Sequence, residues 1–206
     1  GEVSGPPLPD LLRAAGFGNA DAWAAVLLEP MRLRGILGPR RVAAFLATTA
    51  HESNGGRRLV EEMTYSADRI RAVWPSRFPT PESAAPLARN PAALAEAVYG
   101  GRLGNSEPGD GWRYRGRGLI QITGRANYGM AGDALVMPLL ARPEMVEGRE
   151  VAAAVSCWWW AAHGCNDLAD AGDVEAWRRR VNGGLVGLAD VRRRYVDVLA
   201  AMGAGR

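Results

Sequence analysis

Helix-forming residues fill the segments between glycines and prolines. This alternation of helix-forming segments and helix-breaking residues constrains the fold more than any other feature of the sequence. Alanine is abundant, and 48% of the 206 residues are hydrophobic, which is enough for one sizeable core. We find no internal repeat, no low-complexity segment and no linker between domains. The sequence therefore predicts a mainly α fold, with a flexible N-terminal arm over residues 1–7 and a single domain over residues 8–206.

Proline, glycine and capping residues set the expected limits of the helices. Asn19, Ser66 and Asp173 are predicted to cap the helices that follow them. Residues 75–90 and 100–111 are predicted to be loops, because they are rich in residues that interrupt helices. The expected helices cover residues 8–15, 20–34, 39–53, 67–74, 91–99, 129–137, 143–160, 174–181 and 188–202.

The predicted helix over residues 39–53 has an apolar stripe that would face the core. The stripe consists of residues at positions i, i+3, i+4 and i+7: Val42, Phe45, Leu46 and Thr49. Three residues further along the same face is Glu52. A carboxylate on the buried side of a helix end, against apolar neighbours, is expected to have a raised pKa because it is desolvated. Such a group can donate a proton near neutral pH, so Glu52 is a candidate general acid.

A second carboxylate is expected to face the first. Gly55 and Gly56 break the helix, so Glu61 and Glu62 belong to a separate segment that can lie across a gap from Glu52. Acidic side chains are most often ordinary solvated charges, and this alternative applies to each of the two. Spacing alone leaves open which of them would work with Glu52.

Residues 114–128 form a stretch that is too polar for a core strand and too rich in glycine for a helix. Its glycines allow the backbone to approach a neighbour or a ligand closely. Gln121, Thr123 and Asn127 would then present hydrogen-bonding groups to whatever lies opposite. An arginine-decorated surface turn is the alternative. The aromatic Tyr114 either stacks on a ligand ring or fills the core, and the sequence does not decide between these two roles.

Charge and hydropathy limit the possible partners. The net charge is +3 and the pI is about 9.2, but 22 acidic residues are interspersed with 25 basic ones. This favours anionic partners mildly and does not resemble a nucleic-acid-binding tail. The longest apolar run, residues 151–162, is too short to span a bilayer. The first residues have no signal-peptide character, and no export route can be read from them.

Histidine and cysteine are too sparse for a metal site. His51 and Glu52 begin like a zinc-protease motif, but the second histidine would have to stand at the position of Gly55. We therefore do not expect a histidine-rich metal site. Cys157 and Cys165 are expected to be two reduced thiols rather than a disulfide framework.

Several segments together resemble one known family, glycoside hydrolase family 19, and within it the compact endolysins of bacteriophages. The most specific of them is the block YRGRGLIQITGRANY at residues 114–128. The segments occur in the family's order and cover roughly residues 35–195. The others are AHES at 50–53, EEMTYSA at 61–67, NDLAD at 166–170 and RVNGG at 180–184.

This resemblance implies a lysozyme-like helical fold with two lobes around a central cleft. It matches Glu52 to the general acid, Glu61 to the second carboxylate and Thr123 to the hydroxyl that helps to hold the attacking water. The neighbouring Glu62 departs from the family pattern, so the identity of the base stays open between Glu61 and Glu62. The expected substrate contacts come from His51, Tyr65, Tyr114, Arg117, Gln121, Asn127 and Asn182.

The implied reaction is hydrolysis of β-1,4 bonds in an N-acetylated glycan with inversion, which needs two carboxyl groups about 6.5–9.5 Å apart. The reaction implied by the resemblance requires neither a metal nor an organic cofactor. We expect peptidoglycan as the substrate, a monomeric protein, and action at the cell wall in the periplasm or outside the cell. A chitinase that cleaves GlcNAc polymers is the alternative with the same residues. A non-catalytic glycan-binding module and a nucleic-acid-binding helical protein are the rivals from other classes.

Overall fold

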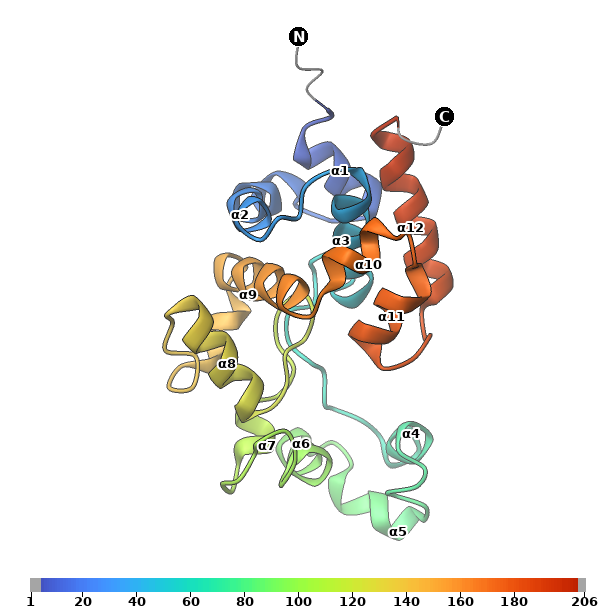
Figure 1. Ribbon diagram of the computed structural model, residues 1–206. Helices are drawn as coiled ribbons and strands as arrows, with labels where there is room; N and C mark the ends of the chain where they lie inside the picture. The colour runs from blue at the N-terminus through green and yellow to red at the C-terminus, as the bar shows by residue number, and fades with distance from the viewer. Residues whose placement is uncertain (1–4, 204–206) are drawn as a thin grey trace.

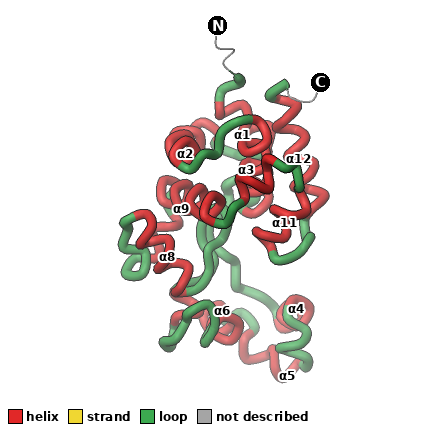
Figure 2. The backbone as a smooth tube through the Cα atoms, viewed as in Figure 1, coloured by secondary structure: helices red, strands yellow, loops and turns green. Residues whose placement is uncertain are grey.

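The computed structural model of the protein describes residues 5–203, and helices dominate this part of the chain (Figures 1 and 2). No strand is found among these residues, and Arg117 forms isolated antiparallel bridges with Val60 and Ile122. The mainly α prediction is confirmed. The elements are α1 Leu8–Ala15, α2 Ala20–Leu33, α3 Pro39–Glu52, α4 Ala67–Val73, α5 Pro81–Ala84, η1 Ala85–Leu87, α6 Pro91–Tyr99, α7 Asp110–Arg113, α8 Arg125–Leu135, η2 Pro143–Glu147, α9 Arg149–Ala162, α10 Cys165–Asp170, α11 Val174–Asn182 and α12 Leu188–Ala201.

The largest hydrophobic cluster surrounds α3 and includes residues of α1, α2, α9, α10, α11 and α12. Every residue of α3 from Ala43 to Ala50 is buried, so this helix is central to the larger part of the molecule. The rings of Phe45 and Trp160 meet edge to face at 5.7 Å inside this cluster. Because α3 is packed so tightly, its last residue is held in a defined position.

The helices α4, α5, α6 and α7 lie apart from that group, at the bottom of Figure 1. They have their own hydrophobic cluster, which includes Met63, Ile70 and Leu94. Residues 57–66 and 114–124 run between the two parts without helix, and they contact each other through the bridge between Val60 and Arg117. These two irregular segments therefore connect the two helical groups.

Two predicted elements differ from the structure, one because of a local capping motif and one because of a glycine. Residues 75–90 are not one loop, since they contain α5 and η1. Thr80 and Ser83 form a reciprocal capping box, and Pro81 occupies the first helical turn. The predicted helix over residues 143–160 is split at Gly148, which precedes α9.

The start of α8 and one cap also differ from the prediction. Helix α8 begins at Arg125, inside the stretch that was expected to be non-helical. Asn19 precedes α2 in a left-handed conformation, and its side chain makes no capping hydrogen bond. The caps at Ser66 and Asp173 are confirmed, since each side chain accepts a hydrogen bond from a first-turn N–H.

The N-terminal residues, the lengths of the helices and the two cysteines bear on three further predictions. Residues 1–4 of the predicted arm lie outside the described part of the chain, and α1 starts at Leu8. Between residues 5 and 203, no helix has the length and hydrophobicity needed to cross a bilayer. Cys157 and Cys165 are both buried and free, and burial raises the pKa of the Cys165 thiol to about 12. The prediction of reduced thiols agrees with this arrangement.

Candidate active site

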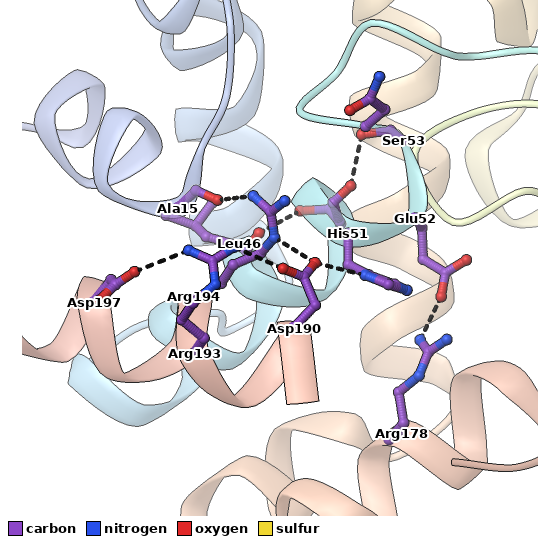
Figure 3. A network of polar contacts seen from close by, with 12 residues as sticks. Ala15, Leu46, His51, Glu52, Ser53, Arg178, Asp190, Arg193, Arg194 and Asp197 are labelled. Carbon is purple, nitrogen blue, oxygen red and sulfur yellow. Dashed lines mark hydrogen bonds and ion pairs between the residues drawn. The ribbon is translucent and has the colours of Figure 1, made fainter. Parts of the chain in front are cut away.

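Glu52 is the last residue of α3, and its side chain is 19% exposed. The helical phase predicted from the sequence is correct, but the expected apolar surroundings are wrong. Oε1 of Glu52 accepts a hydrogen bond from Nη1 of Arg178 on α11, in the close ion pair that Figure 3 shows. Oε2 has no hydrogen-bond partner in the described part of the chain. The carboxylate therefore has one oxygen held by a cation and one oxygen free.

Arg178 was missed by the sequence analysis, although the sequence contains a signal for it. Its side chain is only 2% exposed, and its Nε donates to the carbonyl oxygen of Val186 at 2.7 Å. On α11, Val174, Trp177, Arg178 and Val181 stand at i, i+3, i+4 and i+7. An arginine on such an apolar stripe must be buried with a partner. The same reasoning that identified Glu52 therefore identifies Arg178 as well.

His51 connects the end of α3 to α12, next to Glu52 (Figure 3). Its Nδ1 lies 2.7 Å from Oδ2 of Asp190, and because a carboxylate only accepts, Nδ1 carries the proton of this bond. The other edge of the ring covers Gly187, where an added Cβ would lie 2.2 Å from Nε2 of the imidazole. His51 therefore holds the start of α12 and the backbone before it against α3.

Asp190 joins three cationic or donor side chains. Besides His51, it accepts hydrogen bonds from Arg193 at 2.6 Å and from Arg194 at 2.7 Å. Arg194 in turn donates to the carbonyl oxygen of Ala15 at the end of α1. Burial by itself would raise the pKa of Asp190, but the hydrogen bonds from Arg194, His51 and Arg193 hold it well below its ordinary value. This network stabilises the helical group behind Glu52.

Glu61 lies on the irregular segment opposite, where backbone contacts set its position. Its N–H donates to the carbonyl oxygen of Gly116 at 2.8 Å. In the side chain, Oε1 accepts from the hydroxyl of Tyr99 at 2.6 Å and Oε2 accepts from the N–H of Gly116 at 3.1 Å. Burial and the nearby Glu61 carboxylate raise the pKa of Tyr99, so its hydroxyl remains a donor. Both oxygens of Glu61 are thus oriented by hydrogen bonds.

Gly116 is required at this point because of its neighbours. An added Cβ would lie 2.9 Å from Oε1 of Gln121 and 3.1 Å from Oε2 of Glu61. A side chain here would push both polar groups away from the backbone. Gly116 therefore allows the backbone of residues 114–128 to lie close to Glu61 and Gln121, as the glycine-rich sequence predicted.

Glu62 has a different environment from Glu61. It is exposed, and its Oε1 accepts a hydrogen bond from the N–H of Thr64 at 2.8 Å. This local bond from Thr64 lowers the pKa of Glu62. Glu62 is therefore bonded within its own turn, whereas Glu61 is bonded to residues of two other segments.

A pocket of about 230 Å³ contains both candidate carboxylates. Of the residues predicted from the sequence, Tyr65 and Gln121 also line it. Arg58, an exposed cation that was not predicted, is on the wall as well. The full lining is Glu52, Arg58, Glu61, Glu62, Tyr65 and Gln121.

Tyr114 and Arg117 are placed in the core, and the expectation that they contact substrate must be corrected. Tyr114 is 2% exposed, and its hydroxyl donates to the carbonyl oxygen of Leu140 at 2.9 Å. Arg117 is 4% exposed and pairs with Glu147 at 2.9 Å. Arg117 also donates to the hydroxyl of Tyr128 at 3.1 Å. The polar groups of Tyr114 and Arg117 are hydrogen-bonded inside the protein, so these two residues of the motif stabilise the core.

The other predicted residues lie outside the lining of this pocket. The Thr123 hydroxyl donates to the carbonyl oxygen of Gln121 at 3.2 Å, and Nδ2 of Asn127 donates to the carbonyl oxygen of Thr123 at 2.7 Å. Both side chains therefore support the turn that carries Gln121. Asn182 is the exposed last residue of α11, and its substrate contact stays a prediction. In residues 5–203, no group of three or more His, Cys, Asp or Glu side chains could hold a metal ion.

The pocket thus combines two carboxylates that differ in what holds them. Glu52 comes from a packed helix and keeps one oxygen free, whereas Glu61 comes from an irregular segment and has both oxygens bonded. A free carboxyl oxygen can carry and deliver a proton, and an oriented carboxylate can accept one from water. The arrangement is suited to acid–base hydrolysis.

Comparison with known proteins agrees with this chemistry. Residues 37–177 match the family described as chitinase class I, glycoside hydrolase family 19. A glycosyl hydrolase family 19 domain-containing protein of Haemophilus influenzae is 38% identical over 164 residues, which cover 78% of this chain and 80% of the relative. An endochitinase of Arabidopsis thaliana is 31% identical over 173 residues, which cover 83% of this chain and 49% of the plant protein. The chain therefore spans about half the length of that plant relative.

A solved structure shares the fold at lower sequence identity. The chitinase C structure from Streptomyces griseus HUT6037 has a TM-score of 0.64 and 20% identity, over 100% of this chain and 98% of that chain. This likeness supports the expected lysozyme-like helical fold, and the sequence matches extend over most of the chain. The protein therefore belongs to glycoside hydrolase family 19 and is a glycoside hydrolase.

Proposed function

We propose that the protein hydrolyses β-1,4 bonds of bacterial peptidoglycan with inversion, using Glu52 as the general acid and Glu61 as the general base. The observation that carries this proposal is that both carboxylates line one pocket but come from separate segments. Inversion requires room for a water molecule between the base and the sugar, and carboxylates on separate segments can provide it. Neighbouring positions on one helix would be too close.

Glu52 must carry a proton when the glycosidic bond breaks. Arg178 donates to Oε1 and competes with a proton at that oxygen, so we assign the transferred proton to Oε2. The guanidinium then balances the negative charge that Glu52 acquires when the proton leaves. Because Arg178 is also bonded to the carbonyl oxygen of Val186, it keeps Glu52 in one orientation through the reaction.

Glu61 would activate the water on the opposite face of the ring. Its bonds from Tyr99 and Gly116 fix the plane of the carboxylate. Gln121, whose backbone is left-handed with a φ of 61°, lines the same pocket, and we expect its amide group to help orient the water or the sugar. We prefer Glu61 to Glu62 as the base, because Glu62 is exposed and bonded within its own turn.

Peptidoglycan is our preferred substrate because of charge. Its peptides carry carboxylates, whereas chitin is a neutral polymer, and the exposed Arg58 supplies a cation on the wall of the pocket. The net charge of +3 favours binding to such an anionic polymer. A wall substrate implies that the protein, which we expect to be monomeric, acts in the periplasm or outside the cell.

Chitin is the second candidate. The specific observation in its favour is that several relatives in this family, including the Arabidopsis protein, are named endochitinases. The proposed acid and base would be the same for both polymers, so the pocket residues do not separate them. The preference must be measured.

Product analysis tests the proposal. Purified peptidoglycan and chitin oligomers are incubated with the protein in parallel, and the soluble products are identified by mass spectrometry. We expect muropeptides with new reducing ends and little product from chitin. Efficient cleavage of chitin alone would contradict the peptidoglycan assignment. No product from either polymer, with the protein folded, would favour the glycan-binding module.

The stereochemistry needs its own measurement. Proton NMR of a soluble oligosaccharide during the first minutes of cleavage shows which anomer forms before mutarotation. Inversion of a β bond gives the α anomer first. The β anomer as the initial product would contradict the two-carboxylate inverting mechanism.

A further inference from the structure

Another pocket lies beside the carboxylates, in the smaller helical group at the bottom of Figure 1. Its volume is about 310 Å³, and its walls come from the residues after α4, the end of α6 and the loop that follows α6. We call it the side pocket, and the mechanism assigns no part of the substrate to it. Its lining consists of Trp74, Arg77, Val98, Tyr99, Arg102 and Leu103.

Two aromatic side chains connect the side pocket to the pocket of the two carboxylates. Tyr99 lines the side pocket, and its hydroxyl donates to Oε1 of Glu61 at 2.6 Å. Trp74 also lines it, and the centre of its ring is 5.7 Å from that of Tyr65, which lines the carboxylate pocket. A group attached to a sugar at Glu61 is therefore within reach of the side pocket.

The side pocket has two arginines and, among the described residues that line it, no acidic one. The side chain of Arg102 is exposed and makes no hydrogen bond or ion pair within residues 5–203. Arg77 donates to the carbonyl oxygens of Ala97 at 3.3 Å and Val98 at 2.6 Å, and it has no carboxylate partner in the same part of the chain. The two guanidiniums therefore give the pocket a positive charge, which favours an anionic ligand.

A short turn holds Arg102 and Leu103 in place. Asn105 is 2% exposed, its Nδ2 donates to the carbonyl oxygen of Tyr99 at 3.0 Å, and its N–H donates to the carbonyl oxygen of Arg102 at 2.8 Å. Leu103 has a left-handed backbone with a φ of 52°, which is unfavourable for leucine, and it is 47% exposed. Folding alone gains little from this strained residue, because nearly half of it stays in water. The turn is therefore suited to holding an apolar side chain ready for a ligand.

The chemistry of the lining favours an acidic peptide over a sugar ring. The hydroxyl groups of a sugar need polar partners, but the lining has no carboxylate or amide side chain, and the Tyr99 hydroxyl is already bonded to Glu61. The two guanidiniums bind carboxylates well. The apolar surfaces of Trp74, Val98 and Leu103 suit short aliphatic side chains.

We propose that the side pocket binds the peptide of a muramic acid residue, with a peptide carboxylate at Arg102 and alanine methyl groups against Leu103 and Trp74. This assignment rests on the proposed function, because peptidoglycan carries peptides and chitin does not. Binding of the peptide in the side pocket would hold the attached sugar beside Glu61. The side pocket would then contribute to the choice between the two polymers.

Calorimetry on the whole protein tests the site directly. The probe is N-acetylmuramoyl-L-alanyl-D-glutamic acid, compared with its diamide, and neither compound contains a glycosidic bond that the protein could cleave. We expect the acid to bind more tightly. Arg102→Ala should weaken binding of the acid about threefold to fivefold, the effect of an exposed ion pair, and leave binding of the diamide unchanged. Leu103→Ala should weaken both about threefold, because the apolar contact is common to both. Equal binding of acid and diamide, or an acid affinity that either variant leaves unchanged, would overturn the proposal.

Cleavage separates this site from the proposed function. Purified peptidoglycan is compared with the same glycan strands after an amidase has removed the peptides. Arg102→Ala should lower kcat/KM on the peptide-bearing strands about threefold and leave the rate on the bare strands unchanged. An equal effect on both substrates would overturn the peptide site while the proposed function stands. No cleavage of either substrate by the natural protein would contradict the proposed function, and binding of the probe would then decide on the side pocket alone.

The matched control is Arg192→Ala, which removes an equal charge from an exposed position on α12 in the other helical group. It should leave the affinity for the probe and both cleavage rates unchanged. A loss of affinity as large as that of Arg102→Ala would show an effect of total charge and would overturn the proposal. Arg102→Ala is expected to fold normally, since its side chain has no bond to lose, and a thermal unfolding curve verifies this.

Discussion

Glu52 and Glu61 line the same pocket, yet they are held by different kinds of structure. Glu52 ends a 14-residue helix whose buried face is part of the main core, and a buried arginine pairs with it. Glu61 stands on a segment without helix or ladder, and its carboxylate is placed by one hydroxyl and one backbone N–H. One wall of the pocket therefore depends on side-chain packing, and the other depends on backbone contacts.

Substitutions in the two walls should therefore have different effects on stability and activity. A packed helix resists small changes, but breaking its buried ion pair leaves a desolvated charge. An irregular segment tolerates changes at the surface, as at Glu62, but depends on the few bonds that orient it. We therefore expect substitutions behind Glu52 to affect stability and activity together. Substitutions around Glu61 should affect mainly activity.

The largest effect is expected from the proposed acid. Glu52→Gln keeps the size of the side chain and can still accept a bond from Arg178, but it cannot deliver a proton. Loss of general acid catalysis should reduce kcat by about 10²–10⁴-fold. The measurement is the initial rate on purified wall polymer, with thermal unfolding as the control for folding. A variant that keeps a tenth or more of the activity would remove Glu52 from this role.

The second test separates two neighbouring glutamates. Glu61→Gln should lower kcat by about 10²–10⁴-fold, because the base is lost while the bond from Tyr99 can persist. Glu62→Gln is the matched control and should change the rate by no more than a few-fold. Both rates are measured on the same polymer. The reverse ranking would transfer the role of base to Glu62.

Arg178 tests whether the packed wall couples stability to activity. Arg178→Gln removes a buried cation and leaves the partly buried Glu52 without its partner. We expect the free energy of unfolding at pH 7 to fall by about 2–4 kcal/mol, measured with denaturant, together with a drop in kcat. The double variant with Glu52→Gln should lose less than the sum of the single effects. Full additivity would show that the two side chains do not act as a pair.

The smallest effect is expected behind the active site, at Asp190. Asp190→Asn removes the charge that His51, Arg193 and Arg194 bond to, and should cost about 1–2 kcal/mol at pH 7. The folded pKa of Asp190 is lowered, so its contribution is complete above the unfolded value of about 3.9 and is lost as pH falls through the folded value. The stability difference between the variant and the natural protein should therefore shrink on acidification below pH 4. A constant difference would mean that the effect is one of packing alone.

Much of the helical architecture was accessible from the sequence. The buried face of α3, the limits of α1, α6 and α12 to within about two residues, and the caps at Ser66 and Asp173 follow from spacing and local hydrogen bonding. Errors occurred where a short capping motif competed with composition, as at Thr80, and where a glycine interrupted a long apolar run, as at Gly148.

The residues of the candidate site could be predicted only in part from the sequence. Glu52, Glu61, Tyr65 and Gln121 were predicted and line one pocket. Tyr114 and Arg117 belong to the same conspicuous motif, yet they are buried against partners elsewhere in the chain. Motif membership identified the right segment, but it did not say which side chains face the pocket, because that depends on what packs behind the segment.

The sequence by itself determined the local periodicity, and with it the helices and the phase that puts Glu52 and Arg178 on buried faces. Only the tertiary structure decided that these two residues, 126 positions apart, become partners. It also decided that Glu61, rather than Glu62, is bonded to residues of other segments. The physical reason is that the two features depend on interactions of different range. Helical phase repeats every 3.6 residues and can be predicted from neighbouring residues, whereas an ion pair between two helices depends on how the whole core packs.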